Sequence, residues 1–116
     1  MPVNALTVDV EDWFEGIELD PGTWEKFEPR LHVGLARLLS LLGAQGIRAT
    51  FFVLGSAAQR HPKLVRLIAQ QGHEIATHGF HHRFLYHLEP RQFAQELAAS
   101  VRLLQEISGQ RVVGHR

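Results

Sequence analysis

Two groups of side chains in this sequence have the types and the spacing needed for metal chemistry. Asp9, Glu11 and Asp12 lie within or directly after an apolar run near the start of the chain, and His78 and His82 are four residues apart. Histidines at that spacing on a helical turn or tight loop face the same way and can share a metal ion. A carboxylate as third ligand would leave open positions, where the ion can hold a water and lower its pKa or polarise a carbonyl group.

The competing interpretation is that these residues are simply the polar ends of solvated loops. Asp9 argues against it, because Asp9 lies inside an apolar run, where a buried carboxylate needs a compensating role. The histidine count also favours a role in metal binding or proton transfer, since eight of the 116 residues are histidine. Imidazole ligates metals and transfers protons near neutral pH.

Several other kinds of site are excluded by residue type. The chain has no cysteine, which excludes disulfides, thiolate zinc sites and cysteine nucleophiles. The pair His73-Glu74 does not begin a His-Glu-x-x-His zincin motif, because the next histidine, His78, is five residues after His73. The sequence also has no Gly-rich phosphate loop and no Gly-x-Ser-x-Gly nucleophile elbow.

Composition limits the partners and the location that we expect. Lys plus Arg and Asp plus Glu number 12 each, so the formal net charge is zero, which argues against nucleic acid as a partner. No apolar run reaches about 18 residues, so no membrane span is expected. Residues 1–4 lead into the fold without the features of a signal peptide. If Met1 is the natural start, we expect a cytoplasmic protein.

Hydrophobic periodicity predicts alternating strands and helices in one domain, residues 1–116. The expected strands are residues 5–10, 48–54, 73–77 and 111–113, and the expected helices are residues 30–44, 62–71 and 90–107, with a short helical turn after Ser56 and a loop over 11–28. Repeated strand–helix units imply an α/β fold with a parallel sheet. Periodicity leaves an open sheet and a barrel as alternatives, and in both the ligand binds at the carboxyl ends of the strands.

Two sequence stretches resemble the NodB-type polysaccharide deacetylases, carbohydrate esterase family 4. They are residues 49–55 (ATFFVLG) and residues 72–82 (GHEIATHGFHH). The opening residues 7–14 (TVDVEDWF) resemble the branch found in bacterial exopolysaccharide gene clusters. The resemblance extends over nearly the whole chain. It implies a distorted (β/α) barrel and metal-dependent removal of acetyl groups from N-acetylated polysaccharides.

The resemblance also implies a role for each candidate residue. Asp9 matches the catalytic base, and His78 and His82 match the two metal-binding histidines. Arg116 matches an arginine of the active-site groove and is expected to hold and orient Asp9. For the acidic metal ligand, the spacing of related branches favours Glu11, in agreement with strand alternation, and Asp12 is the alternative. The expected cofactor is a divalent metal, with zinc preferred.

The match to the family stops at Arg116. The later family motifs, which include the histidine that acts as general acid, are absent from these residues. A full barrel of this kind needs roughly 200 to 250 residues. The sequence therefore predicts the N-terminal half of a deacetylase domain. Open strand edges and exposed apolar faces would then favour self-association.

Two alternative functions remain open from the sequence. One is a small-molecule C–N hydrolase, similar to the allantoinase-like relatives that share the Asp-x-Glu start. Four aromatic residues, expected to be exposed, would cap its small pocket: Trp13, Phe14, Trp24 and Phe27. The other alternative is a non-catalytic fragment that binds metal through Glu11, His78 and His82 and lacks the general acid.

Overall fold

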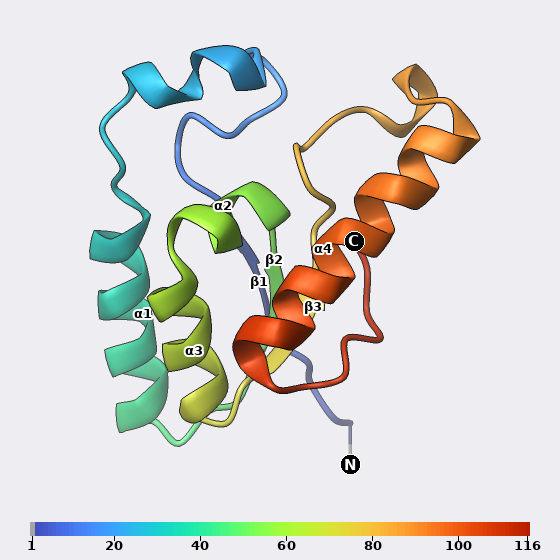
Figure 1. Ribbon diagram of the computed structural model, residues 1–116. Coiled ribbons are helices and arrows are strands. Elements are labelled where there is room, and N and C mark those ends of the chain that lie inside the picture. Colours follow the sequence, from blue (N-terminus) through green and yellow to red (C-terminus); the bar gives the residue numbers. More distant parts are fainter. Residues whose placement is uncertain (1) are drawn as a thin grey trace.

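Three parallel strands form the centre of the computed structural model, which describes residues 2–116 (Figure 1). The strands β1 (Thr7–Val10), β2 (Thr50–Val53) and β3 (Glu74–Thr77) pair in the order β1-β2-β3. The helices are α1 (Leu31–Ala44), α2 (Gly55–Arg60), α3 (Pro62–Gln70) and α4 (Pro90–Ser108), with two 3₁₀ helices, η1 (Pro21–Lys26) and η2 (Leu85–His87). The α/β class with parallel strands and helical crossovers, expected from the sequence, is confirmed.

One face of the sheet packs against the helices. Side chains of a strand alternate between its two faces, and the helix-facing ones form a continuous core. The core contains Val10, Phe51, Val53 and Ile75 from the strands, Leu35, Leu39 and Leu42 from α1, Val65 and Ile68 from α3, and Leu104 from α4. Because the three strands are parallel, their carboxyl ends lie at one edge of the sheet. The candidate site lies at this edge.

Helix α4 shows why the predicted helix forms where it does. Pro90 occupies its first turn, and Glu89 and Gln92 form a reciprocal capping box at its N-terminus. Gly109 ends the helix with a φ of 72°, in the left-handed region that glycine adopts readily. No helix of the described residues is both long and apolar enough to cross a membrane.

The fourth strand, expected at residues 111–113, does not form; this prediction was wrong. Close to the predicted position, Thr77 and His115 form an isolated parallel bridge. The Thr77 N–H donates to the Gly114 carbonyl over 2.9 Å, and the Arg116 N–H donates to the Thr77 carbonyl over 3.1 Å. The chain therefore joins β3 only near the carboxyl end of that strand.

A glutamine side chain takes the place of the missing strand along the rest of β3. Gln110 Oε1 accepts the Ile75 N–H over 2.9 Å, and Gln110 Nε2 donates to the His73 carbonyl over 2.8 Å. These are backbone groups on the β3 edge that a neighbouring strand would otherwise pair. Residues 111–113 have strand propensity, but the β3 backbone groups with which they would pair are already bonded to the Gln110 side chain.

The loop over residues 11–28 contains a second small core. Phe14 and Trp24 are buried there against Leu54 and Ala57, whereas Trp13 is 60% exposed. The expectation that all four aromatic residues of this loop are exposed was therefore wrong for Phe14 and Trp24. Apolar packing holds the segment that follows β1 against α2.

Candidate metal centre

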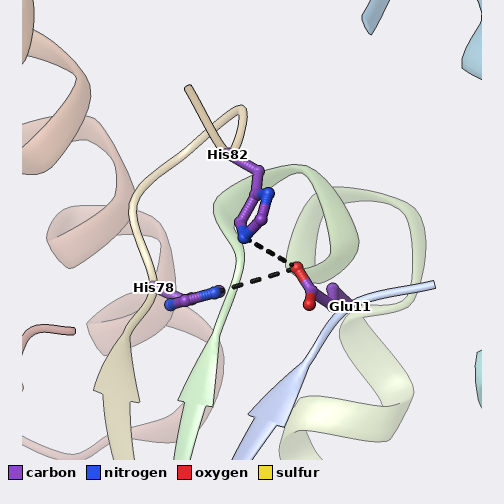
Figure 2. A group of neighbouring side chains, drawn as sticks. All are labelled: Glu11, His78 and His82. Carbon is purple, nitrogen blue, oxygen red and sulfur yellow. Dashed lines mark ion pairs between the residues drawn. The ribbon is translucent and has the colours of Figure 1, made fainter. Parts of the chain in front are cut away.

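Three of the sequence-predicted ligands meet at the carboxyl edge of the sheet. Glu11 follows β1, His78 follows β3, and His82 lies in the turn after His78; Figure 2 shows the three side chains pointing toward one another. Glu11 Oε2 lies 3.2 Å from His82 Nε2 and 3.8 Å from His78 Nε2. One ligand atom from each residue lies within 4.8 Å of the others. The parallel sheet thus joins residues that are 67 or more positions apart, from residue 11 to residues 78 and 82.

The tautomer of His78 suits a metal ligand. His78 Nδ1 lies 2.5 Å from the backbone oxygen of Arg116, the last residue of the sequence. A backbone oxygen only accepts, so Nδ1 is the donor, and a neutral imidazole in this tautomer has its lone pair on Nε2. That lone pair is on the atom nearest to Glu11. A backbone partner of this kind commonly fixes the orientation of a ligating histidine.

The free polar atoms of the cluster also fit a cation. Glu11 Oε2 is buried and has no hydrogen-bond partner among residues 2–116; its nearest polar neighbours are the two imidazole Nε2 atoms, which offer it a positive charge only when protonated. A buried carboxylate oxygen beside neutral imidazoles is costly, and a bound cation would remove that cost. Two atoms bound to one tetrahedral ion at about 2.1 Å lie about 3.4 Å apart. The two Glu11–histidine separations, 3.2 and 3.8 Å, bracket this value.

We call residues 78–82 the histidine turn, because this tight segment presents both imidazoles. Gly79 has a φ of 78°, and His82 has a φ of 54°, an uncommon conformation for a residue with a Cβ. The Gly79 N–H donates to Thr77 Oγ1 over 3.2 Å, and Thr77 Oγ1 lies 2.7 Å from the buried Ser100 Oγ. Buried hydroxyl groups therefore connect the start of the turn to α4.

Asp9 and Arg116 form an ion pair beside the three candidate ligands, and the Asp9 side chain is 38% exposed, so the burial expected from its apolar run was wrong. Arg116 donates to Asp9 Oδ1 from Nε over 3.1 Å and from Nη2 over 2.5 Å. Its guanidinium lies over the Phe52 ring, 4.6 Å from the centroid, and donates to Thr7 Oγ1. Arg116 therefore reaches from β3, where its backbone is bonded to Thr77, across β2 to β1.

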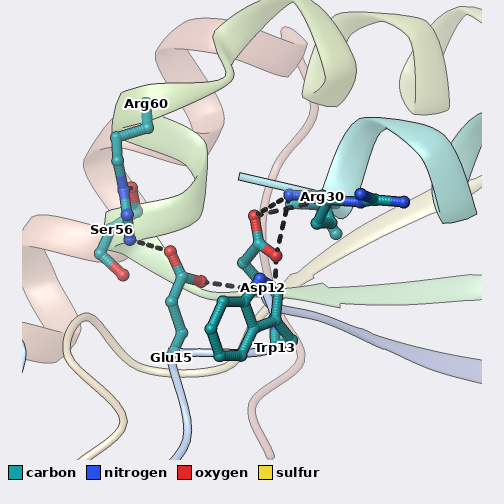
Figure 3. Close-up of polar contacts among 7 residues, drawn as sticks. Asp12, Trp13, Glu15, Arg30, Ser56 and Arg60 are labelled. Atoms are coloured by element: carbon teal, nitrogen blue, oxygen red, sulfur yellow. Dashed lines mark hydrogen bonds and ion pairs between the residues drawn. The ribbon is translucent and has the colours of Figure 1, made fainter. Parts of the chain in front are cut away.

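Asp12, the alternative acidic ligand, is directed away from the histidines. Its buried carboxylate accepts the N–H groups of Trp13, Arg30 and Leu31 over 2.9 to 3.1 Å (Figure 3). Arg30 and Leu31 begin α1, so Asp12 caps this helix from a distant part of the chain. Of the two acidic candidates that the sequence left open, Glu11 lies beside the histidines, whereas Asp12 caps the N-terminus of α1.

Two residues that sequence reasoning missed lie directly behind this arrangement. Glu15 is fully buried, accepts the Asp12 N–H over 3.0 Å and forms an ion pair with Arg60 at the end of α2. Burial lowers the pKa of Arg60, and the nearby negative charge of Asp12 acts in the opposite direction. Nothing in the sequence pairs residues 15 and 60, because they are 45 positions apart and no local spacing pattern joins them.

A hollow of about 360 Å³ adjoins the candidate ligands. His78 and His82 form part of its wall, and most of the remaining lining is apolar, from Phe84, Phe93 and Leu97. A substrate group bound there would lie next to the two imidazoles. A second hollow, of about 290 Å³, lies between the β1 segment and α1, and its lining includes Asp9, Glu11 and Leu35.

Comparisons with known proteins bear on this arrangement. A family model described as "Polysaccharide deacetylase" matches residues 23–116. The chain is 35% identical over 86 residues to the peptidoglycan deacetylase-like protein FGM2 of Gibberella zeae, and 31% identical over 78 residues to a chitooligosaccharide deacetylase of Bradyrhizobium sp.. It is also similar to the structure of peptidoglycan deacetylase PdaC from Bacillus subtilis, with 25% identity and a TM-score of 0.75.

These matches cover much of this chain and a smaller share of each relative. The covered shares of this chain are 72%, 67% and 97%, against 25%, 36% and 46% of FGM2, the Bradyrhizobium enzyme and PdaC. The chain thus spans less than half the length of these relatives. The family model nevertheless matches well over half of the chain. The resemblance that the sequence motifs suggested is confirmed, and the chain belongs to the polysaccharide deacetylase family.

Proposed function

We propose that this chain supplies the metal-binding half of a hydrolase that removes N-acetyl groups from an N-acetylated polysaccharide. The observation that carries the proposal is the meeting of Glu11, His78 and His82 beside the Asp9–Arg116 pair. Metal ligands and a separate carboxylate that can accept a proton are the two components that metal-assisted amide hydrolysis needs. Family membership supports the same reaction class.

Glu11 Oε2, His78 Nε2 and His82 Nε2 would hold a divalent ion, which we propose is zinc. Such an ion would polarise the acetamide carbonyl and lower the pKa of a water molecule. The donor set of one carboxylate and two imidazoles suits zinc and other first-row divalent metals. His78 is already oriented for this role by its bond to the Arg116 backbone oxygen.

Asp9 is the proposed general base. Both hydrogen bonds from Arg116 end on Asp9 Oδ1, so Oδ2 is the oxygen that would take a proton from the attacking water. Arg116 fixes the plane of the carboxylate and supplies a positive charge beside it.

We propose that the proton for the leaving amine comes from a histidine outside residues 1–116, as the family resemblance implies. The resemblance of residues 7–14 suggests an exopolysaccharide as the substrate.

The substrate class can be tested with the complete protein that contains this chain. We expect zinc-loaded protein to release acetate from N-acetylated chito-oligosaccharides and to leave a cyclic amide intact. Ring opening of the cyclic amide without acetate release would favour the allantoinase-like alternative. Stoichiometric zinc with neither product would favour the non-catalytic alternative.

The role of Asp9 can be tested in the same assay. We expect Asp9→Asn to lower kcat by about 10² to 10⁴-fold, the usual contribution of a general base, with zinc still bound. Asp20→Asn is the matched control. It is the same substitution, made at a residue whose side chain caps η1 and is not among the candidate site residues. Equal activity of Asp9→Asn and Asp20→Asn would contradict the proposed role of Asp9.

A further inference from the structure

An ion pair between buried Glu15 and partly exposed Arg60 joins the loop after β1 to the end of α2. Glu15 is fully buried, and its Oε1 pairs with Arg60 Nη2. The Arg60 guanidinium lies over the rings of Phe14 and Trp24, 5.1 and 5.6 Å from their centroids, and Arg60 Nε donates to the Ser56 carbonyl. Burying the Glu15 carboxylate is expensive unless it is paired, and a pair with this many partners is held in one geometry.

The second oxygen of Glu15 acts on the backbone next to Glu11. Glu15 Oε2 accepts the Asp12 N–H over 3.0 Å, and this N–H belongs to the peptide bond between Glu11 and Asp12. The Asp12 carboxylate is held separately by the first N–H groups of α1 (Figure 3). The peptide unit that carries Glu11 is therefore fixed from two sides, and the direction of the Glu11 side chain follows from it.

The opposite end of α2 contacts the histidine turn. The Gly55 N–H donates to the Gly79 carbonyl over 2.8 Å, and the Ser56 N–H donates to the Phe80 carbonyl over 3.0 Å. One short helix is thus bonded at its first residues to the segment that carries His78 and His82. At its last residue, Arg60, it is bonded to the segment that carries Glu11.

We propose that Glu15 and Arg60 are positioning residues for the metal centre, and that α2 sets the separation between the Glu11 carboxylate and the two histidines. This inference rests on the proposed metal-binding function. Neither residue touches the candidate ligand atoms; both act through the peptide unit between Glu11 and Asp12. Partners behind metal ligands typically change metal affinity by 10 to 100-fold when they are removed, because a misdirected ligand binds poorly.

A purely structural role for Glu15 would give a different result from a positioning role. Removing one partner of an ion pair with a buried carboxylate lowers stability wherever the pair lies, so stability alone cannot separate the two roles. Gln110→Ala is the matched control, because the Gln110 side chain also holds a backbone N–H, that of Ile75 in β3. Ile75 lies in the sheet, away from the carboxyl edge where the candidate ligands meet.

The test is a Co²⁺ titration of the full chain, followed by the visible absorption of the bound ion, with melting temperatures measured on the metal-free proteins. We expect Glu15→Ala to weaken Co²⁺ binding by about 10-fold or more and to alter the absorption spectrum. We expect Gln110→Ala to lower the melting temperature but to keep the Co²⁺ affinity and the absorption spectrum of the wild type. Wild-type affinity and spectrum in folded Glu15→Ala would overturn the positioning role.

A milder variant decides the question if Glu15→Ala does not fold. Glu15→Gln keeps the shape but leaves one oxygen for two donors, the Asp12 N–H and Arg60, so we expect binding to weaken by a smaller factor, about 3-fold or more. Unchanged affinity in Glu15→Gln would then overturn the inference.

His78→Ala separates the two proposals. If wild type binds Co²⁺ and His78→Ala does not, the metal centre stands whatever the Glu15 variants show. If wild type does not bind Co²⁺, both proposals fail.

Discussion

At the scale of single residues, the candidate site depends on which atom of each side chain is already engaged. His78 has Nδ1 committed to the Arg116 backbone oxygen, Asp9 has Oδ1 committed to Arg116, and Glu11 Oε2 has no hydrogen-bond partner among the described residues and faces the two imidazole Nε2 atoms. Each commitment leaves one particular atom for chemistry: Nε2, Oδ2 and Oε2, respectively. The arrangement is specific because the free atoms are determined by hydrogen bonding as well as by residue type.

His73 provides a pH-dependent prediction outside the site. It is 3% exposed, and its Nδ1 accepts the Ala49 N–H over 3.2 Å. Burial, and to a lesser extent the charge of Arg48, lowers the pKa of His73. The unfolded chain therefore binds more protons than the folded chain below the ordinary histidine pKa of about 6.5. Stability is fully present above that pH and falls as the pH drops through it toward the folded-state value.

We expect the melting temperature of the metal-free protein to fall between about pH 7.5 and pH 5.5. The fall should be smaller in His73→Gln, because glutamine offers an acceptor for the Ala49 N–H but does not titrate. Burial also lowers the pKa of His61, so a residual fall is expected in the variant. Equal falls in wild type and His73→Gln, measured by thermal unfolding, would contradict this assignment.

The sequence predicted the candidate ligands more completely than it predicted the residues that hold them in place. The spacing of His78 and His82 and the alternation of Asp9 and Glu11 are local patterns, and the structure brings all four residues to one edge of the sheet. The sequence favoured Glu11 over Asp12, but the contact that Asp12 makes depends on the start of α1, 18 residues further along the chain. Such long-range hydrogen bonds leave no periodic signal in a single sequence.

At the scale of elements, the approach between α2 and the histidine turn is unusually close. A Cβ on Gly55 would lie 2.6 Å from Phe80 Cδ2 and 3.1 Å from the Phe80 Cα. Glycine is therefore required there for space, because any side chain would push the turn away from α2. Phe80 lies midway between His78 and His82, so a displaced Phe80 would move both imidazoles.

Gly55→Ala is accordingly expected to destabilise the fold by about 1 to 3 kcal/mol, the usual cost of overpacking. Gly43→Ala is the matched control: no atom lies within 4 Å of the added Cβ, and Gly43 is in α1. Alanine there should stabilise the helix by about 0.5 to 1 kcal/mol. Urea unfolding would measure both changes, and a neutral or stabilising Gly55→Ala would refute the close-contact argument.

Most elements could be predicted because their signals are local. Helices 30–44, 62–71 and 90–107 were expected from apolar spacing and terminal Pro or Gly residues, and the observed helices differ by one residue at an end. The expected strand at residues 111–113 failed because propensity does not reveal that Gln110 already pairs with the β3 edge. Helix α2 was expected only as a short turn, since six residues carry little periodicity.

At the scale of the whole molecule, the face of the sheet opposite the helices carries Asp9, the proposed base, and the Arg116 side chain that pairs with it. Asp9, Phe52 and Ala76 are register partners on neighbouring strands and share this face. Arg116 crosses it from β3 to β1, over the ring of Phe52. The chain spans less than half the length of the relatives compared above. Self-association through exposed strand edges stays a prediction.

The most direct test of this account is the zinc content of the purified protein after dialysis against a zinc buffer. We predict one zinc ion per chain in wild type and in His32→Ala, an exposed histidine of α1. We predict loss of that zinc in Glu11→Ala and in His78→Ala, with the fold retained by circular dichroism. Zinc retained at wild-type stoichiometry in both ligand variants, or absent from the wild-type protein, would contradict the metal centre on which the proposed function rests.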